Sequence, residues 1–241
     1  MIAEAIQKII DISVPHFLDT DAGTFSDKNM TRIPRSVRAE PITVRSLKGF
    51  TDYIKEIYMD DTPMTRDYFV IVENERRVSL MSFLDEDKRR EVIIRADAET
   101  PDIEFDRFRE TERMIIALQT KFVNDPKTDL AKVQKFVGTT TAGTVKEYSD
   151  DGVTQQATVK QGVRGKVDEI VPNPCRLRPI RTFAEVEQPD SLFAFRLRQD
   201  GGEVSGALFE ADGGVWRLSA IENIKAYLKD ELKETGVKVI G

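Results

Sequence analysis

The sequence predicts an α+β fold in which helices are segregated from largely antiparallel sheets. In some segments apolar residues recur at the spacing of one helix face, and in others they alternate with a period of two between turn-forming residues. These patterns divide the chain into an N-terminal α/β part over residues 1–140 and a β-rich part over residues 141–241. We expect the second part to be a β-meander that is closed by a capped helix.

The first predicted element is an amphipathic helix, and the isoleucines that share its apolar face are Ile2, Ile6, Ile9 and Ile10. Pro15 ends this helix. Residues 17–41 show no sustained period and contain scattered Gly, Ser, Asn and Pro, which predicts a long arm. Loops without structure are rarely longer than about 12–15 residues inside a compact domain. We therefore expect this arm to wrap the body of the protein or to contact something else, such as a second copy.

Helices and strands alternate in the rest of the N-terminal part. Residues 47–57 carry a helical apolar stripe, and strands follow over residues 68–72, 78–84 and 91–95.

Two further helices should complete this part. A long helix is expected over residues 105–122, where the apolar face consists of Phe105, Phe108, Ile115, Leu118 and Phe122. The positive end of the helix dipole favours the acidic residues at its start. A second helix should begin at Asp125, with Pro126 at its first position and Gly138 just past its end. We expect the two helices to pack as an antiparallel hairpin.

The apolar period changes to two from residue 143. Residues 144–148 and 153–160 flank an Asp-Asp-Gly turn and predict a hairpin. Prolines break up residues 172–179, so this stretch should be an extended edge strand or a loop.

Asp-Gly-Gly turns separate the three strands of the predicted meander, which are residues 192–198, 204–210 and 215–218. The closing helix is expected over residues 219–235, because Ser219 and Glu222 have the spacing of a capping box. Trp216 should be at least partly buried on the last strand of the meander.

Composition limits the function classes. The chain has 241 residues, 32% of them charged, and a net charge of −6, which gives no global attraction for nucleic acid or anionic lipid. Its single cysteine and single histidine exclude an internal disulfide and a zinc site built from several such ligands. The apolar runs are far shorter than the roughly 20 residues that cross a bilayer. We read no secretory signal and expect no membrane partner.

Groups that could perform catalysis are scarce. His16 is the only imidazole, and Cys175 has a neighbouring cation, Arg176, but is more typical of a small structural side chain. The glycine spacing of residues 138–144 resembles a phosphate-binding loop, yet a threonine stands where the lysine is required. Carboxylate runs such as residues 85–87 are common on acidic surfaces. We therefore expect no enzyme activity, no cofactor and no metal.

Basic side chains gather between residues 153 and 182, where six of them stand against two acidic residues. On the strand over residues 192–198, alternation should place Phe193, Phe195 and Leu197 in the core and two arginines on the opposite face. The candidate ligand-binding residues of this basic belt are Lys160, Arg164, Lys166, Arg176, Arg178, Arg181, Arg196 and Arg198. They indicate either a surface that binds a compact anion or an ordinary solvated loop.

The C-terminal third carries a resemblance to a known family. It is found in VPNPCRLRPIRTFAEVEQP at residues 171–189, ALFEADGGVWRL at 207–218, IENIKAYL at 221–228 and the hairpin DDGVTQ at 150–155. These runs resemble an uncharacterised family of proteins encoded by temperate phages and prophages of Gram-positive bacteria. The resemblance covers about residues 140–235 and implies a viral origin and action inside a bacterial host. It transfers no catalytic residue, because the family has none assigned.

Together these observations predict a non-enzymatic phage binding protein in the host cytoplasm, either a host-directed or counter-defence factor or an accessory of replication. A nucleic-acid or nucleotide binder that uses the basic belt is the first alternative, and a virion structural protein is the second. The expected partner is accordingly a host protein, a short nucleic acid or a nucleotide. We also expect self-association, because open meanders have edges that need covering.

Overall fold

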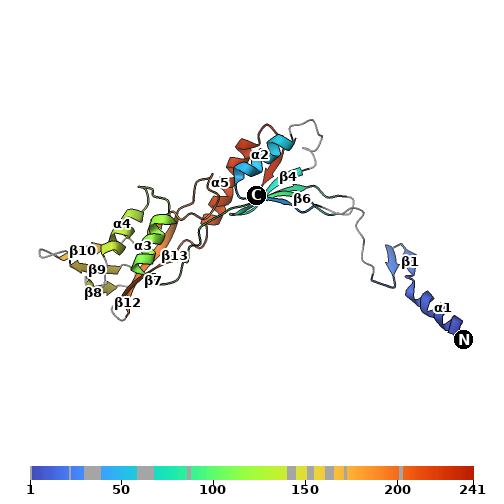
Figure 1. The fold of residues 1–241 in the computed structure, drawn as a ribbon, viewed down its shortest axis with the longest axis horizontal. Coiled ribbons are helices and arrows are strands. Elements are labelled where there is room, and N and C mark those ends of the chain that lie inside the picture. The colour runs from blue at the N-terminus through green and yellow to red at the C-terminus, as the bar shows by residue number, and fades with distance from the viewer. Residues whose placement is uncertain are drawn as a thin grey trace. The chain divides into compact units, whose positions relative to one another are not determined.

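A computed structural model of the chain describes residues 2–21, 23–29, 39–58, 68–85, 88–139, 145–150, 155–160, 166–170, 173–200 and 203–241 (Figure 1). The helices are α1 (Ile2–Ser13), α2 (Leu47–Tyr58), α3 (Thr111–Thr120), α4 (Leu130–Thr139) and α5 (Trp216–Glu231). The first strands are β1 (Phe17–Thr20), β2 (Gly23–Ser26), β3 (Ile42–Val44), β4 (Tyr68–Asn74), β5 (Arg77–Ser82), β6 (Val92–Asp97) and β7 (Arg109–Glu110). The remaining strands are β8 (Val145–Asp150), β9 (Gln155–Lys160), β10 (Lys166–Ile170), β11 (Cys175–Leu177), β12 (Ser191–Asp200), β13 (Glu203–Glu210) and β14 (Lys238–Ile240). These elements confirm the α+β class.

The chain divides into two compact units, Met1–Arg38 and Ala39–Gly241. The smaller unit contains α1, as predicted, and an antiparallel hairpin of β1 and β2 in which Leu18 pairs with Phe25. The prediction of an arm without regular structure was therefore wrong for the segment that forms this hairpin. Its strands have only four residues each, which is too short for a period of two to stand out.

The larger unit contains a five-stranded sheet in the order β14-β4-β5-β6-β3. Its central pairs are antiparallel, as predicted, while both edge strands, β14 and β3, pair in parallel. Helices α2 and α5 pack against this sheet and against each other. Apolar side chains from all three layers form the first core, which includes Leu47, Phe50, Ile54, Val70, Leu80, Ile94, Phe183, Ile224 and Leu228.

A second sheet has the order β11-β12-β13-β7 and is antiparallel throughout. Helix α3 packs against β13 and against α4. The second core lies here and includes Met114, Leu118, Leu130, Val133, Val137, Cys175, Phe193, Phe195 and Leu197. The burial of Phe193, Phe195 and Leu197 confirms the core face predicted for this strand.

A third sheet has the order β10-β9-β8, and all its pairs are antiparallel. It confirms the hairpin predicted from the Asp-Asp-Gly turn, although residues 151–154 of that turn lie outside the described part of the chain.

The two cores do not follow the sequence order. The first draws on α2, β4, β5 and β6 and then again on α5, whereas the second is built from residues between them. Each core therefore contains residues from both sides of residue 140, where the sequence had indicated a boundary.

The bounds of two predicted helices need correction. The helix expected over residues 105–122 is the shorter α3, because Phe105 stacks on Phe193, at 5.1 Å between ring centroids, from an irregular segment. Helix α4 begins at Leu130 instead of Asp125 and includes Gly138.

The third strand of the meander does not form. Residues 216–218 belong instead to the first turn of α5, after Gly213 and Gly214 reverse the chain with φ of +64° and +81°. Because the helix already includes Ser219, the predicted capping box is wrong, and Val215 stands at the N-cap without a side-chain hydrogen bond.

Candidate ligand-binding cleft

The structure places three predicted belt arginines on the segment from β11 onward and pairs each with acidic side chains. Arg176 Nη1 donates to Asp190 Oδ2 at 2.8 Å. Arg178 Nη1 lies 2.9 Å from Asp125 Oδ2 and 3.2 Å from Glu187 Oε1. These contacts tie the edge strand β11 and the residue after it to the segment before β12 and to the segment before α4.

The other belt residues have different settings. Arg196 and Arg198 lie on the face of β12 opposite the core, and the Arg198 guanidinium carbon is 4.5 Å from the centroid of the Phe108 ring. The side chains of Lys160 and Lys166, and the whole of Arg164, lie outside the described part of the structure. Convergence of the complete belt therefore stays a prediction.

Arg181 is the buried member of the set. Its Nη1 donates to Glu210 Oε1 at 2.6 Å, and its Nη2 donates to Ser191 Oγ. The guanidinium carbon lies 3.8 Å from the centroid of the Trp216 ring at the start of α5. Burial lowers the pKa of Arg181 to about 10, so this arginine is still charged at neutral pH.

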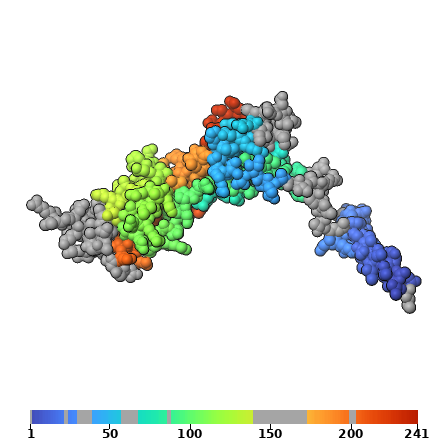
Figure 2. Space-filling model, viewed as in Figure 1, coloured from blue at the N-terminus to red at the C-terminus, as the bar shows by residue number. Residues whose placement is uncertain are grey.

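A buried amide fixes the backbone around Arg181. Gln188 Oε1 accepts hydrogen bonds from the backbone N–H of Arg181 at 2.9 Å and of Thr182 at 3.1 Å. The Thr182 hydroxyl in turn donates to the carbonyl oxygen of Glu75 in the β4–β5 turn. The segment after β11 is thereby tied to the first sheet, and Figure 2 shows its orange atoms between the yellow-green surface of α3 and α4 and the blue surface of α2.

A cleft of about 320 Å³ opens where these elements meet. Its lining comes from the β4–β5 turn, the segment after β6, the end of β13 and the start of α5, and includes Arg76, Asp102, Asp106, Arg181, Glu210, Trp216 and Arg217. This volume is at the lower end of the roughly 300–1,000 Å³ typical of small-molecule sites.

The three cleft arginines differ in how firmly they are held. Arg76 donates from Nε to the Arg181 carbonyl oxygen at 3.2 Å, and no described carboxylate lies in ion-pair distance of it. Arg217 is half exposed, lies 3.7 Å from a carboxylate oxygen of Glu75, and has its guanidinium carbon 4.8 Å from the Trp216 ring centroid. Arg76 and Arg217 are therefore the cations that an incoming ligand can bind, while Arg181 is already paired with Glu210.

Two buried donors of the cleft residues have no hydrogen-bond partner within the described structure: Trp216 Nε1 and Arg181 Nε. Both side chains are almost completely buried. A buried N–H group without an acceptor costs about 1–3 kcal/mol.

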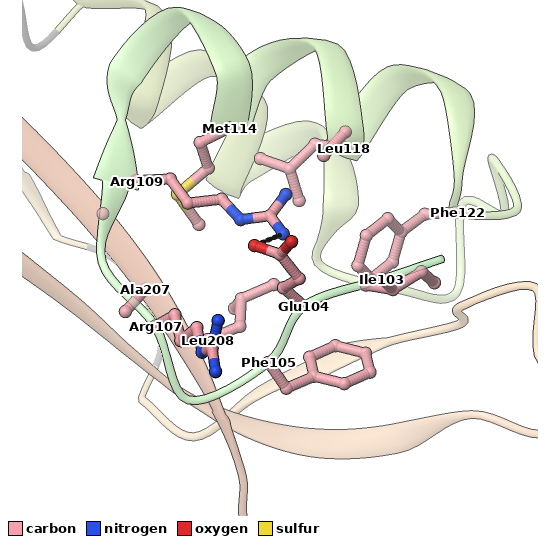
Figure 3. Close-up of a pocket in the computed structure, with 12 residues that line it drawn as sticks. Ile103, Glu104, Phe105, Arg107, Arg109, Met114, Leu118, Phe122, Ala207 and Leu208 are labelled. Carbon is pink, nitrogen blue, oxygen red and sulfur yellow. Dashed lines mark ion pairs between the residues drawn. The ribbon is translucent and has the colours of Figure 1, made fainter. Parts of the chain in front are cut away.

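A smaller, apolar pocket lies beside the cleft and shares Ile103 and Phe105 with it (Figure 3). Met114 and Leu118 project into it from α3, and the ion pair of Glu104 with Arg109 crosses it. Its volume is about 20 Å³, enough for little more than one water molecule. This pocket is a packing defect of the second core and not a ligand site.

The structure bears out the interpretation of Cys175 as a structural side chain. It is fully buried, and its Sγ lies 3.4 Å from the carbonyl oxygen of Phe193. Burial raises the pKa of this thiol to about 12, which is the reverse of the shift that makes a cysteine reactive.

Within the described ranges, no cluster of three or more His, Cys, Asp or Glu residues could hold a metal ion. In the same ranges no helix is both long and apolar enough to cross a membrane.

No family model, no curated protein and no solved structure matches the chain. The function of the site therefore has to be inferred from its own geometry.

Of the cleft residues, sequence reasoning identified only Arg181 as a candidate. Arg76 and Arg217 are far apart in the sequence and belong to no motif, and Trp216 was expected on a strand, so no local signal joined them.

Proposed function

We propose that the chain is a non-enzymatic binding protein, encoded by a temperate phage and acting in the cytoplasm of the bacterial host. Its ligand is a compact organic anion of about nucleotide size. One observation carries this proposal: Arg181 and Arg217 lie over the ring of Trp216, and Arg76 lines the same cleft of about 320 Å³. Binding of this kind suits either a counter-defence factor or an accessory of phage replication.

The charges around the cleft favour a small anion over a long one. Arg76 and Arg217 supply guanidinium groups, which bind phosphate or carboxylate through two parallel hydrogen bonds. Asp102 and Asp106 are exposed on the same lining and the chain as a whole carries −6, so an extended polyanion would be repelled outside the cleft. A nucleoside monophosphate fits both the volume and this charge distribution.

Isothermal titration calorimetry of the full chain tests the proposal. The probes are inorganic phosphate, adenosine and guanosine monophosphates, and a ten-nucleotide single strand. We expect a monophosphate to bind most tightly, and Arg76→Ala and Arg217→Ala each to weaken it by roughly 10- to 100-fold, since hydrogen bonds to charged groups contribute about 1.5–3 kcal/mol.

Arg113→Ala is the matched control, because Arg113 is exposed on α3 and does not line the cleft. It should bind like the wild type. The proposal fails if none of these probes binds at millimolar concentration, or if the two cleft variants bind as tightly as the control.

A further inference from the structure

The smaller unit exposes an unusual amount of apolar surface. Helix α1 has no buried residue, and five isoleucines on it are 48–80% exposed: Ile2, Ile6, Ile9, Ile10 and Ile12. The hairpin adds Phe17, Leu18 and Phe25, which are 55–64% exposed. Isolated apolar side chains are normal on a protein surface, but the five isoleucines share one side of α1, and a contiguous apolar patch of this kind marks an interaction site.

This unit lacks a core of its own. None of its residues whose burial the structure describes is buried. A 12-residue helix is marginal in water without tertiary packing, and so is a lone two-stranded hairpin. The apolar face of α1 therefore needs a surface to pack against.

We propose that α1 packs against the α1 helices of other copies of this chain, and that it assembles them into a trimer or tetramer. Ile2, Ile6 and Ile9 are spaced four and three residues apart, which is the seam of a helical bundle. Isoleucine at both kinds of seam position favours three or four strands over two. Ile10 and Ile12 widen the seam on its two sides, as a bundle of more than two helices requires.

The charges of the smaller unit favour a second copy over a lipid surface. The polar side of α1 carries both signs, with Glu4 and Asp11 against Lys8. Residues 2–29 contain five acidic and two basic side chains. A helix that lies on a membrane usually has a polar face rich in Lys and Arg, which this one is not.

Light scattering coupled to size-exclusion chromatography of the full chain tests the assembly. At micromolar concentration the wild type should give three or four times the monomer mass of 27.4 kDa. The double variant Ile6→Asp with Ile9→Asp should give 27.4 kDa, because it places charge in the seam. Ile116→Asp is the control, since this isoleucine is 52% exposed on α3, and it should keep the wild-type mass.

Two further measurements make each outcome decisive. In thermal unfolding, the transition of the larger unit should occur at the same temperature in the double variant as in the dissociated wild type. This would show that the larger unit of the variant is still folded. Flotation with vesicles of phosphatidylcholine and phosphatidylglycerol should leave the protein unbound. A monomeric wild type, an unchanged mass in the double variant, or a monomer that floats with the vesicles would each overturn the proposal, and none of these results depends on ligand binding in the cleft.

Discussion

The Arg181 guanidinium carbon lies 3.8 Å from the centroid of the Trp216 ring, and the same guanidinium donates a 2.6 Å hydrogen bond to Glu210. Arg181 follows the edge strand of the second sheet, Glu210 ends β13, and Trp216 opens the helix that covers the first sheet. This buried cation therefore connects the second sheet, through its ion pair with Glu210, to the helix that covers the first sheet, through its cation–π contact with Trp216.

Removing this cation should destabilise the protein strongly. Arg181→Ala leaves the Glu210 carboxylate without its partner, and breaking a buried pair in this way costs about 3–5 kcal/mol. Urea unfolding followed by circular dichroism measures the change. Arg113→Ala, in an exposed pair with Glu110, should change the free energy of unfolding by less than about 0.5 kcal/mol. A loss below about 1 kcal/mol for Arg181→Ala would show that the contacts of Arg181 with Glu210 and Trp216 do not hold the second sheet against α5.

Trp216 should report on the same junction by fluorescence. It is the only tryptophan and is 4% exposed, so we expect blue-shifted emission that acrylamide quenches poorly until the chain unfolds. Trp216→Ala should cost about 3–5 kcal/mol, because it leaves a cavity beside Arg181. Emission at the wavelength of free indole in the native protein would contradict this burial.

Cys175 should be inert in the native state. Its thiol is buried and has a pKa of about 12, so almost no thiolate forms at neutral pH. Mass spectrometry after treatment with iodoacetamide at pH 7.5 should find the native protein unmodified and the urea-unfolded protein fully alkylated. Rapid labelling without denaturant would show that the packing of β11 on β12 opens readily.

Acid should weaken the contact between β11 and the segment before β12. The hydrogen bond from Arg176 is the main cause that lowers the pKa of Asp190 below its ordinary value. A carboxyl whose pKa is lower in the folded than in the unfolded state contributes stability above the unfolded value of about 3.8, and this contribution disappears as the pH falls through the folded value. Asp190→Asn should therefore be less stable than the wild type at pH 7, and the difference should shrink below pH 4. A difference that stays constant between pH 7 and pH 3 would exclude this linkage.

The sequence predicted elements well where one face of a segment meets one core. Leu47, Phe50 and Ile54 share one face of α2, and all three are completely buried in the first core. The alternation of Phe193, Phe195 and Leu197 likewise gave the correct face of β12. In both places the local period and the tertiary environment agree.

Prediction failed where neighbouring residues meet different surroundings. Val215, Trp216, Arg217 and Leu218 alternate like a strand, yet Val215 and Leu218 are 60% and 67% exposed and only Trp216 is buried. Phe105 and Phe108 have helical spacing, but the first stacks on Phe193 and the second meets the edge of Phe209. The cleft could not be predicted at all, because long-range contacts place Arg76 beside Arg181 and Trp216.

The parallel pairing of β14 with β4 bears on the order in which the chain folds. Phe69 on β4 pairs with Lys238 on β14, and most of the second core lies between them in the sequence. During synthesis the ribosome releases β4, β5 and β6 long before α5 and β14, so β4 has an open edge while all residues of the second core are already synthesised. The inserted half should therefore be the first to reach its native packing. The first core, whose residues lie on both sides of it in the sequence, then closes last, and until that moment a chaperone or another nascent chain can compete for the edge of β4.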